Sequence, residues 1–249
     1  MGAATVARLV ADGWSVVATD SCTDDPAIPY PMATRPELDA VATAGGDDVV
    51  AVPVDVRDQQ SLDAAVEVGV ERFGRLDAAI ANAGVFAARD RLWEVSDEEW
   101  DAVVDVDLRG VFHTARAAMP AILASPEPRR GRFVAVASTA AVVGLERMAP
   151  YVAAKHGVIG LVRALAVDLA GTGVTANAVA PGSTRTAILD ASAAAYDTAI
   201  EGFATHQRSL GRLVEVEEIA ATIAFLCSEG AAAITGAVVP VDGGMTSTI

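Results

Sequence analysis

Tyr151 and Lys155 are the residues whose types and spacing most directly suggest chemistry. They stand four positions apart in an Ala-rich segment of helical character, so both side chains lie on one face of a helix. Because a nearby ammonium favours phenolate, we expect Lys155 to lower the pKa of Tyr151 and fit it for acid and base catalysis. Lys155 is the only lysine among 18 lysines and arginines, which indicates a need for a compact ammonium. A chance surface pair would show the same spacing.

Ser138 directly follows a predicted buried strand at 132–137. It therefore lies at the carboxyl edge of a sheet, where α/β proteins bind their ligands. Its hydroxyl can donate a hydrogen bond to the carbonyl oxygen of a substrate. Serine at such a position also caps turns, but the presence of Tyr151 further along the chain favours the catalytic interpretation.

The elements that would position these residues alternate along the chain. Short β-branched runs predict strands, and longer segments between them predict helices. The strands are expected at 15–19, 49–54, 78–81, 132–137, 174–180 and 237–241, and the helices at 3–12, 59–73, 97–123, 149–170 and 216–228. This alternation predicts a single α/β domain over residues 1–249, a doubly wound parallel sheet with helices on both faces.

Two segments interrupt the alternation. Residues 21–36 contain four prolines and are interpreted as a stiff surface insertion. Residues 184–207 are Ala-rich, polar and weakly patterned, which predicts a mobile substrate loop with a short helix. A Gly-x-Gly-x-x-Ala match at 171–176 lies between a predicted helix and a predicted strand. That is the wrong context for a dinucleotide-binding turn, so we interpret it as a tight connection.

Composition excludes several kinds of partner. The formal net charge of −15 would repel nucleic acids and anionic membrane surfaces, so we expect neither as a partner. Two cysteines and three scattered histidines offer no disulfide framework and no metal-ligand spacing, so we expect no metal and a cytoplasmic setting. No apolar run reaches the roughly 18 residues that a membrane span needs. We therefore expect an unanchored protein.

Taken together, these motifs resemble those of the short-chain dehydrogenase/reductase family over nearly the whole chain. The matching pieces are Asp20 after a strand, Val54-Asp55-Val56, Ala81-Asn82-Ala83-Gly84, Ser138, Tyr151-Val-Ala-Ala-Lys155, residues 181–186 (PGSTRT) and the tail from Gly236 to Gly244. The resemblance implies a Rossmann-type fold. It also implies an oxidoreductase that uses NAD to interconvert an alcohol and a carbonyl of a small-molecule substrate by hydride transfer.

The resemblance also implies roles for the three catalytic candidates. Tyr151 would be the general acid and base. Lys155 would hold the nicotinamide ribose hydroxyls and depress the pKa of Tyr151. Ser138 would orient and polarise the substrate oxygen.

Further residues are implied to bind the cofactor. Asp20 would accept hydrogen bonds from the adenosine ribose hydroxyls, and its carboxylate would repel a 2′-phosphate, which favours NAD over NADP. An aspartate that merely caps a loop is the alternative. The other residues are Asp55 and Val56 at the adenine, Asn82, Ala83 and Gly84 where the backbone approaches the cofactor, and Pro181, Gly182, Thr184 and Thr186 at the nicotinamide carboxamide.

Asp107 departs from the family pattern, which usually has asparagine there to support a water chain from the lysine to solvent. An ionised aspartate accepts hydrogen bonds but cannot donate them. The chain of waters is therefore altered, the carboxylate pairs with Lys155, or Asp107 substitutes adequately. These three alternatives stay open.

Gly2 stands at the final glycine of the family's Gly-rich turn, and a helix follows it directly. The resemblance therefore implies that the first strand and most of the turn, about a dozen residues, are missing. That strand is central in the family's order, 3-2-1-4-5-6-7, so its loss would leave two strands with unpaired backbone groups. A wrongly chosen start or a truncated chain explains this more simply than a natural six-stranded variant.

The Pro-rich insertion at 21–36 resembles that of the mycofactocin-coupled subgroup. This implies NAD that is held tightly, with mycofactocin as the external electron carrier, although an ordinary loop insertion would look similar. The family also implies a homotetramer that packs through the helices predicted at 97–123 and 149–170. Ile188, Leu189 and Phe203 favour an apolar substrate, which Trp93 would help to shape. The alternative function is a catalytically impaired dinucleotide-binding or assembly module.

Overall fold

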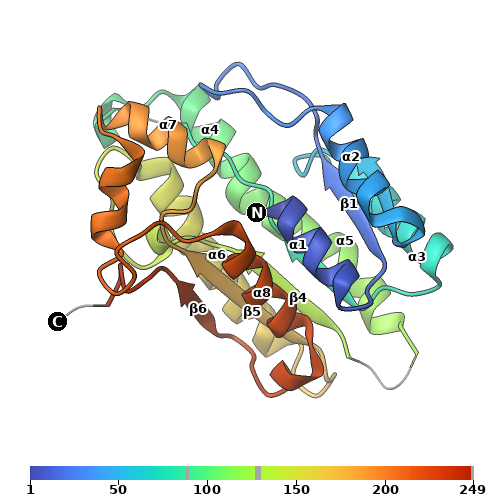
Figure 1. The fold of residues 1–249 in the computed structure, drawn as a ribbon. Helices are drawn as coiled ribbons and strands as arrows, with labels where there is room; N and C mark the ends of the chain where they lie inside the picture. The colour runs from blue at the N-terminus through green and yellow to red at the C-terminus, as the bar shows by residue number, and fades with distance from the viewer. Residues whose placement is uncertain (88–89, 127–129, 248–249) are drawn as a thin grey trace.

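A computed structural model describes residues 1–87, 90–126 and 130–247 of the chain (Figure 1). Strands and helices alternate along it. The strands are β1 (Val16–Asp20), β2 (Val49–Pro53), β3 (Ala78–Ala81), β4 (Arg132–Val136), β5 (Thr175–Pro181) and β6 (Val238–Val241). Every strand lies within one residue of its predicted bounds, because β-branched runs between turn residues are a strong local signal.

The six strands are parallel, but they form two separate hydrogen-bonded groups. β1 pairs with β2, from Val16 opposite Val49 to Asp20 opposite Pro53. The second group has the order β3-β4-β5-β6. Within the described residues no strand connects β1 to β3, so the facing edges of these two strands lack backbone partners from a neighbouring strand. This gap lies at the position that the expected strand order gives to one further strand.

Helices cover both faces of the strands, as predicted (Figure 1). Their bounds are α1 (Gly2–Ala11), α2 (Arg35–Gly45), α3 (Gln59–Phe73), α4 (Asp97–Val104), α5 (Gly110–Ala124), α6 (Ala149–Asp168), α7 (Ala187–Ala195) and α8 (Val216–Cys227). α5 and α6 pack on one face of β3, β4 and β5, where Phe133 is fully buried. α8 packs on the other face, around Val134 and Ile219. The α/β fold class is thus confirmed.

The helix predicted at 97–123 is interrupted at its centre. α4 ends at Val104, α5 begins at Gly110, and Asp105–Arg109 between them form a π-helical turn. A π turn accommodates an extra residue and changes which side chains face inward. Here Asp107 is turned into the protein and has no exposed surface.

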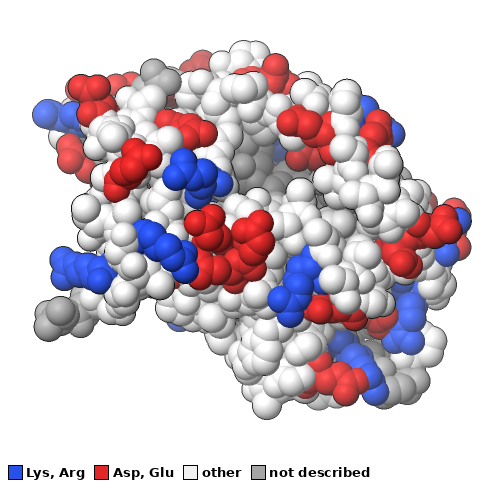
Figure 2. Space-filling model, in the orientation of Figure 1, with Lys and Arg blue, Asp and Glu red and all other residues white. Residues whose placement is uncertain are grey.

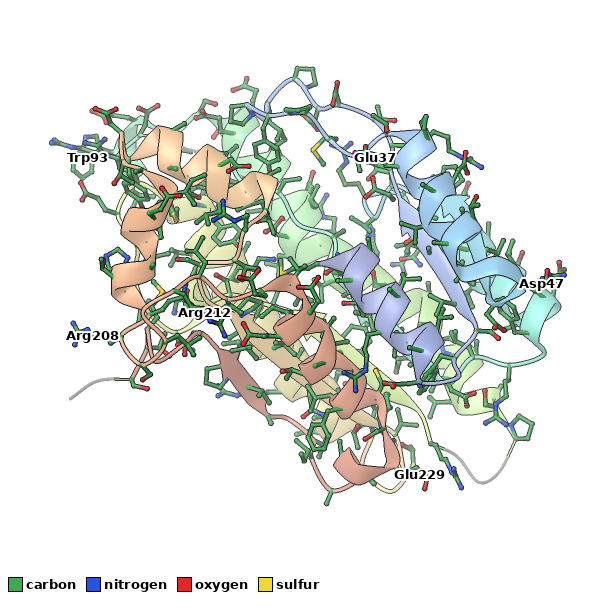
Figure 3. All side chains as sticks on the ribbon, in the orientation of Figure 1. Glu37, Asp47, Trp93, Arg208, Arg212 and Glu229 are labelled. Atoms are coloured by element: carbon green, nitrogen blue, oxygen red, sulfur yellow. The ribbon has the colours of Figure 1, made fainter. Side chains whose placement is uncertain are left out.

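α2 was not predicted, because the nearby prolines suggested irregular structure. Thr34 and Glu37 form a capping box at its start, and a proline occupies its first turn, where proline is tolerated. Figure 3 shows Glu37 at this end of α2. The insertion predicted at 21–36 therefore ends earlier than expected. Residues 21–34 are irregular, and we call them the strap.

The segment predicted as a substrate loop, 184–207, contains more helix than expected. Its short helix is α7, and Ile200–His206 add a 3₁₀ segment. The hydroxyl of Tyr196 donates to the carbonyl oxygen of Glu146, so this segment is attached to the loop that precedes α6.

On the molecular face in Figure 2, basic side chains are scattered among acidic ones. This distribution accords with the excess of 33 acidic over 18 basic residues. None of the described helices is both long enough and apolar enough to cross a membrane.

Candidate active site

Tyr151 and Lys155 lie near the start of α6, which has Pro150 in its first turn. The Nζ atom of Lys155 lies 5.4 Å from the centre of the Tyr151 ring. Lys155 is buried, and Nζ donates a hydrogen bond of 3.2 Å to the carbonyl oxygen of Val136, the last residue of β4. α6 therefore places an ammonium and a phenol together at the carboxyl edge of β4.

Ser138 follows β4 and joins this group. Its Oγ accepts a hydrogen bond of 3.1 Å from the backbone amide of Ala140, and its side chain acts on Tyr151 by lowering the pKa of the phenol. The turn-capping interpretation of Ser138 is confirmed by this contact, and its proximity to Tyr151 leaves the site interpretation as a prediction.

Asp107 forms an ion pair with Lys155, which is one of the three alternatives for this position. Its Oδ2 lies 3.1 Å from Nζ of Lys155, and both side chains are almost completely buried. Its Oδ1 accepts a hydrogen bond of 2.7 Å from the backbone amide of Val85, in the loop after β3. The π turn thus delivers a carboxylate to the ammonium beside Tyr151.

The pKa of Tyr151 is raised, whereas the sequence predicted that it would be lowered. Burial disfavours the phenolate most strongly. Lys155 and the hydrogen bond from Ser138 lower the pKa, Asp107 raises it, and the balance lies above the ordinary value. The predicted effect of Lys155 has the right sign, but the predicted net direction was wrong because the sequence shows neither the depth of burial nor the inward turn of Asp107.

Lys155 has a raised pKa and remains an ammonium. Burial alone would lower its pKa, but the negative charge of Asp107 opposes this effect, together with the phenol of Tyr151 and the contact of Asp107 with Nζ. The lysine is therefore a fixed cation in spite of its burial.

A cavity of about 1370 Å³ opens beside Tyr151 and Lys155 and continues between β1 and β3. The predicted site residues that line it are Gly2, Asp20, Asp55, Val56, Asn82, Ala83, Gly84, Tyr151, Lys155 and Thr186. Those that lie outside its lining are Ser138, Asp107, Pro181, Gly182 and Thr184. The sequence thus identified residues that converge from separate elements on one space.

Asn82 and Gly2 meet at the start of α1, next to this cavity. A Cβ on Gly2 would come 2.9 Å from Nδ2 of Asn82, so a larger residue at this position would require the Asn82 side chain to shift. Oδ1 of Asn82 is buried and has no hydrogen-bond partner among the described residues. An unpaired buried acceptor beside a helix N-terminus fits a polar ligand with both donor and anionic groups, such as a dinucleotide.

Asp20 and Asp55 follow neighbouring strands, but their carboxylates differ in availability. Asp20 accepts one hydrogen bond, from the backbone amide of Cys22 at 3.0 Å. Asp55 is held by Arg57, whose Nη2 lies 2.7 Å from its Oδ2. Burial raises the pKa of Asp55, but its hydrogen bonds with Arg57 outweigh burial and leave the pKa below its ordinary value. Asp20 therefore has the freer carboxylate for a ligand.

The segment after β5 is organised by its own hydroxyls. Thr184 Oγ1 donates to the carbonyl oxygen of Gly182 at 3.0 Å, and Thr186 Oγ1 donates to that of Thr184 at 3.2 Å. A Cβ on Gly182 would come 2.8 Å from the backbone of Asp242, so the segment passes very close to the chain after β6. Pro181 ends β5 opposite Val241.

Trp93 does not shape this cavity. It is 76% exposed and lies at the edge of the molecule (Figure 3). Two residues that the sequence analysis did not select lie at the site instead. Tyr30 from the strap lines the cavity, and the buried ring of Phe86 packs edge-on against Tyr151 with 6.2 Å between ring centres. The only available signal was an aromatic residue within a Pro-rich insertion.

Residues 1–246 match the family model described as enoyl-(acyl carrier protein) reductase. The (−)-trans-carveol dehydrogenase of Rhodococcus erythropolis is 35% identical over 96% of this chain and 91% of its own length. The cyclohexanol dehydrogenase of Acinetobacter sp. strain SE19 is 35% identical over 99% of this chain and 91% of its own.

Among solved structures, that of carveol dehydrogenase from Mycobacterium avium in complex with NAD superposes with a TM-score of 0.93. It is 32% identical and covers 99% of this chain and 94% of that chain. Fold, site and these relatives agree on an α/β oxidoreductase. The chain belongs to the short-chain dehydrogenase/reductase family.

Proposed function

We propose that the protein is an NAD-dependent oxidoreductase that interconverts an alcohol and a carbonyl, with Tyr151 as its general acid and base. The observation that supports this most strongly is the buried ammonium of Lys155, 5.4 Å from the centre of the Tyr151 ring, beside a large cavity. A phenol next to a fixed cation is suited to exchanging a proton with a substrate oxygen. Ser138, whose side chain lowers the pKa of Tyr151, would supply a second contact for that oxygen.

The reaction requires one proton transfer by the protein. In oxidation, the phenolate oxygen of Tyr151 accepts the hydroxyl proton of the alcohol, and a hydride leaves the carbon that bears this hydroxyl, so that the C–O bond becomes a carbonyl. When bound, NAD⁺ supplies the nicotinamide ring that accepts this hydride. In reduction, Tyr151 gives its proton to the carbonyl oxygen. Ser138 would donate a hydrogen bond to the same oxygen and keep it near Tyr151, and Lys155 would hold the ribose hydroxyls of the cofactor.

The residues around the cavity fit NAD. Asp20, with its carboxylate at the end of β1, would accept hydrogen bonds from the adenosine ribose and disfavour a 2′-phosphate. The unpaired Oδ1 of Asn82 and the N-terminus of α1 provide polar contacts further along. The NAD complex of the Mycobacterium avium carveol dehydrogenase supports the same assignment.

A direct test measures NAD content and turnover of the purified protein with NAD⁺ and an artificial electron acceptor. We expect oxidation of an alicyclic alcohol. The artificial acceptor should support turnover, and added NAD⁺ supports it as well if the bound cofactor exchanges. If the protein binds NAD but oxidises no alcohol under either condition, the proposal is wrong, and the alternative of a dinucleotide-binding or assembly module takes its place.

For the substrate we propose an apolar secondary alcohol or the matching ketone. Ile188 of α7 lines the cavity and packs in one apolar cluster with Phe86, Met148 and Tyr151. The related proteins named for carveol and cyclohexanol support an alicyclic ring. Comparing kcat/KM for cyclohexanol with that for a linear diol tests the proposal, since a higher value for the diol would contradict an apolar pocket.

We further propose that NAD is held tightly beneath the strap and that mycofactocin is the external electron carrier. Asp25 of the strap pairs with Arg57 at 2.6 Å, and the strap residues Ile28, Tyr30 and Met32 pack in a cluster with Val85. The strap is thus attached at the ends of β2 and β3 and forms part of the cavity wall. These contacts would slow the release of a ligand that lies beneath the strap.

Retention of NAD through extensive dialysis tests this enclosure. We expect bound NADH to be reoxidised by an artificial carrier while added NAD⁺ fails to exchange with it. Rapid exchange with labelled NAD⁺ would contradict tight enclosure. It would favour the alternative that the strap is an ordinary loop insertion.

We also propose that one more parallel strand fits between β1 and β3. Both strands have an unpaired edge there, and the 1370 Å³ cavity exceeds the roughly 300–1,000 Å³ of usual ligand pockets. Joining a strand-forming segment and a Gly-rich turn ahead of Met1 should raise both Tm and NAD affinity. A scrambled segment of the same composition is the control. Unchanged Tm and unchanged NAD affinity with the strand-forming segment would contradict this proposal.

A homotetramer is our proposal for the assembly. Phe112 of α5 is 43% exposed, and it borders an apolar groove with Leu108, Gly157, Gly160 and Leu161. The groove lies along the helices that the family uses for packing. Sedimentation of the protein should show a tetramer, and Phe112→Asp should dissociate it. A monomeric parent protein would contradict the proposal.

A reducing cytoplasm also remains our proposal. Cys22 and Cys227 are free thiols, and burial raises the pKa of Cys227 to about 12, which makes its thiol unreactive. Fractionation of cells with an antibody against the protein tests the location.

A further inference from the structure

The carboxylate of Asp107 lies among groups that are otherwise suited to an amide. Its Oδ1 accepts from the amide of Val85 at 2.7 Å, a contact that an asparagine oxygen would make equally well. Its Oδ2 serves the ion pair with Lys155 at 3.1 Å. In addition to one acceptor, the ionised aspartate adds a negative charge beside the only lysine. Burial raises the pKa of Asp107, and Lys155 and the amide of Val85 act in the opposite direction and favour the charged form.

We propose that Asp107 offsets the positive charge of Lys155 and thereby favours Tyr151 as a neutral phenol, the form that gives a proton to a carbonyl. This inference rests on the proposed function of Tyr151. It makes Asp107 a residue that sets the protonation state of the acid and base through Lys155, without touching the substrate itself.

The charged and titratable groups that face Tyr151 come from four elements. Lys155 lies on the same helix, Asp107 comes from the π turn, Ser138 from the end of β4, and Tyr30 from the strap. Only Lys155 and Asp107 carry charge among these groups. Their charges have opposite sign and lie in contact, so the carboxylate offsets part of the effect of the ammonium on Tyr151.

Burial makes this balance effective. Asp107 has no exposed surface and Lys155 almost none, so water screens neither charge, and each acts strongly on its neighbours. The pKa of Tyr151 responds to them in opposite directions, down with Lys155 and up with Asp107. Removing the carboxylate leaves a single cation beside the phenol wherever Lys155 stays protonated, and this cation favours phenolate.

The proposal predicts a specific pH behaviour. Alcohol oxidation needs Tyr151 as phenolate, so its rate rises with pH until the phenol has ionised. In Asp107→Asn, the rising limb should move to lower pH by about one unit or more, the size typical of an unbalanced neighbouring charge. Carbonyl reduction at neutral pH should fall, because less of the phenol remains protonated.

A direct readout is the absorbance of tyrosinate, which needs neither cofactor nor turnover. The chain contains three tyrosines, so the difference between titrations with and without Tyr151→Phe isolates Tyr151. We expect its midpoint in Asp107→Asn to lie at least about one unit below that of the parent protein. The titration stays informative even if no alcohol is ever oxidised, so failure of this inference and failure of the proposed function can be told apart.

Two further variants make the test decisive. Asp105→Asn is the matched control, because Asp105 lies in the same π turn but pairs with Arg109 at 3.0 Å at the surface. It should leave the midpoint unchanged. Asp107→Asn combined with Lys155→Met removes both charges and should return the midpoint to near the parent value. If Asp107→Asn alone folds poorly, this double variant still tests whether the two charges offset each other at Tyr151. An unchanged midpoint in folded Asp107→Asn, or an equal shift in Asp105→Asn, overturns the proposal.

Discussion

The hydroxyl of Tyr30 accepts a hydrogen bond of 2.8 Å from the backbone amide of Phe86. The two residues are far apart in sequence, one in the strap and one in the loop after β3. Because the ring of Phe86 packs edge-on against Tyr151, this bond connects the strap to the proposed general acid and base. The loop that carries Phe86 also donates to Asp107 through Val85.

Tyr30→Phe removes only this hydroxyl. Phe86 is 1% exposed, so its amide loses its partner in a buried place, which typically costs about 1–3 kcal/mol of unfolding free energy. We expect urea denaturation to show a loss in this range, together with faster release of NAD. Tyr196→Phe is the control, because it removes a more exposed tyrosine hydroxyl bond. Equal rates of NAD release in the two variants would mean that the Tyr30 hydroxyl does not contribute to cofactor retention.

Tyr151→Phe keeps the ring and its packing against Phe86 but removes the exchangeable proton. General acid and base groups contribute about 10²–10⁴-fold to rate, so turnover should fall by roughly that factor. NAD binding should be retained, as equilibrium dialysis would show. Comparable turnover of variant and parent would mean that Tyr151 does not carry out the proton transfer.

Asp20→Ala tests the choice between the two dinucleotides. Removing the carboxylate removes both the acceptor for the ribose hydroxyls and the repulsion of a 2′-phosphate. We expect kcat/KM for NAD⁺ to fall and the preference over NADP⁺ to shrink by at least about tenfold, or about 1.4 kcal/mol. Asp47→Ala, an exposed aspartate away from the cavity (Figure 3), is the control. An unchanged preference in Asp20→Ala would mean that this side chain does not meet the ribose.

Arg57→Met tests the attachment of the strap. Arg57 pairs with Asp25 of the strap and with Asp55 after β2. Exposed pairs contribute about 0–1 kcal/mol each, so NAD release should accelerate by a factor of up to about ten with little change in overall stability. Arg35→Met, which removes the surface pair with Asp39, should leave release unchanged. Identical release rates for both variants would contradict a role for Arg57.

The sequence predicted the strands and most helices because these depend on local pattern. Strong apolar runs placed all six strands, and residues 59–73 matched α3. α2 was missed because Pro36 was counted as a helix breaker, although proline is favoured in a first helical turn. The π turn at Asp105–Arg109 was missed because nothing local distinguishes it from a continuous helix.

The sequence predicted which residues form the site better than it predicted their pKa values. The spacing of Tyr151 and Lys155 indicated their proximity, and ordered motifs identified residues that line one cavity. The direction of the Tyr151 pKa was wrong, because burial and the orientation of Asp107 arise from tertiary packing. Tyr30 was missed for the same reason, since its contact with Phe86 joins segments that are distant in sequence.

The gap between β1 and β3 has a consequence for cooperativity. Within the described residues, the part that contains β1, β2 and α2 is joined to the rest mainly through side-chain packing of α1 and α3, without a continuous ladder of backbone hydrogen bonds. Such a part can open as its own unit, at a lower free energy than the core around β4 and β5. A ligand that contacts both Asp20 and Tyr151 would bridge the two units, and its binding energy would make them unfold together.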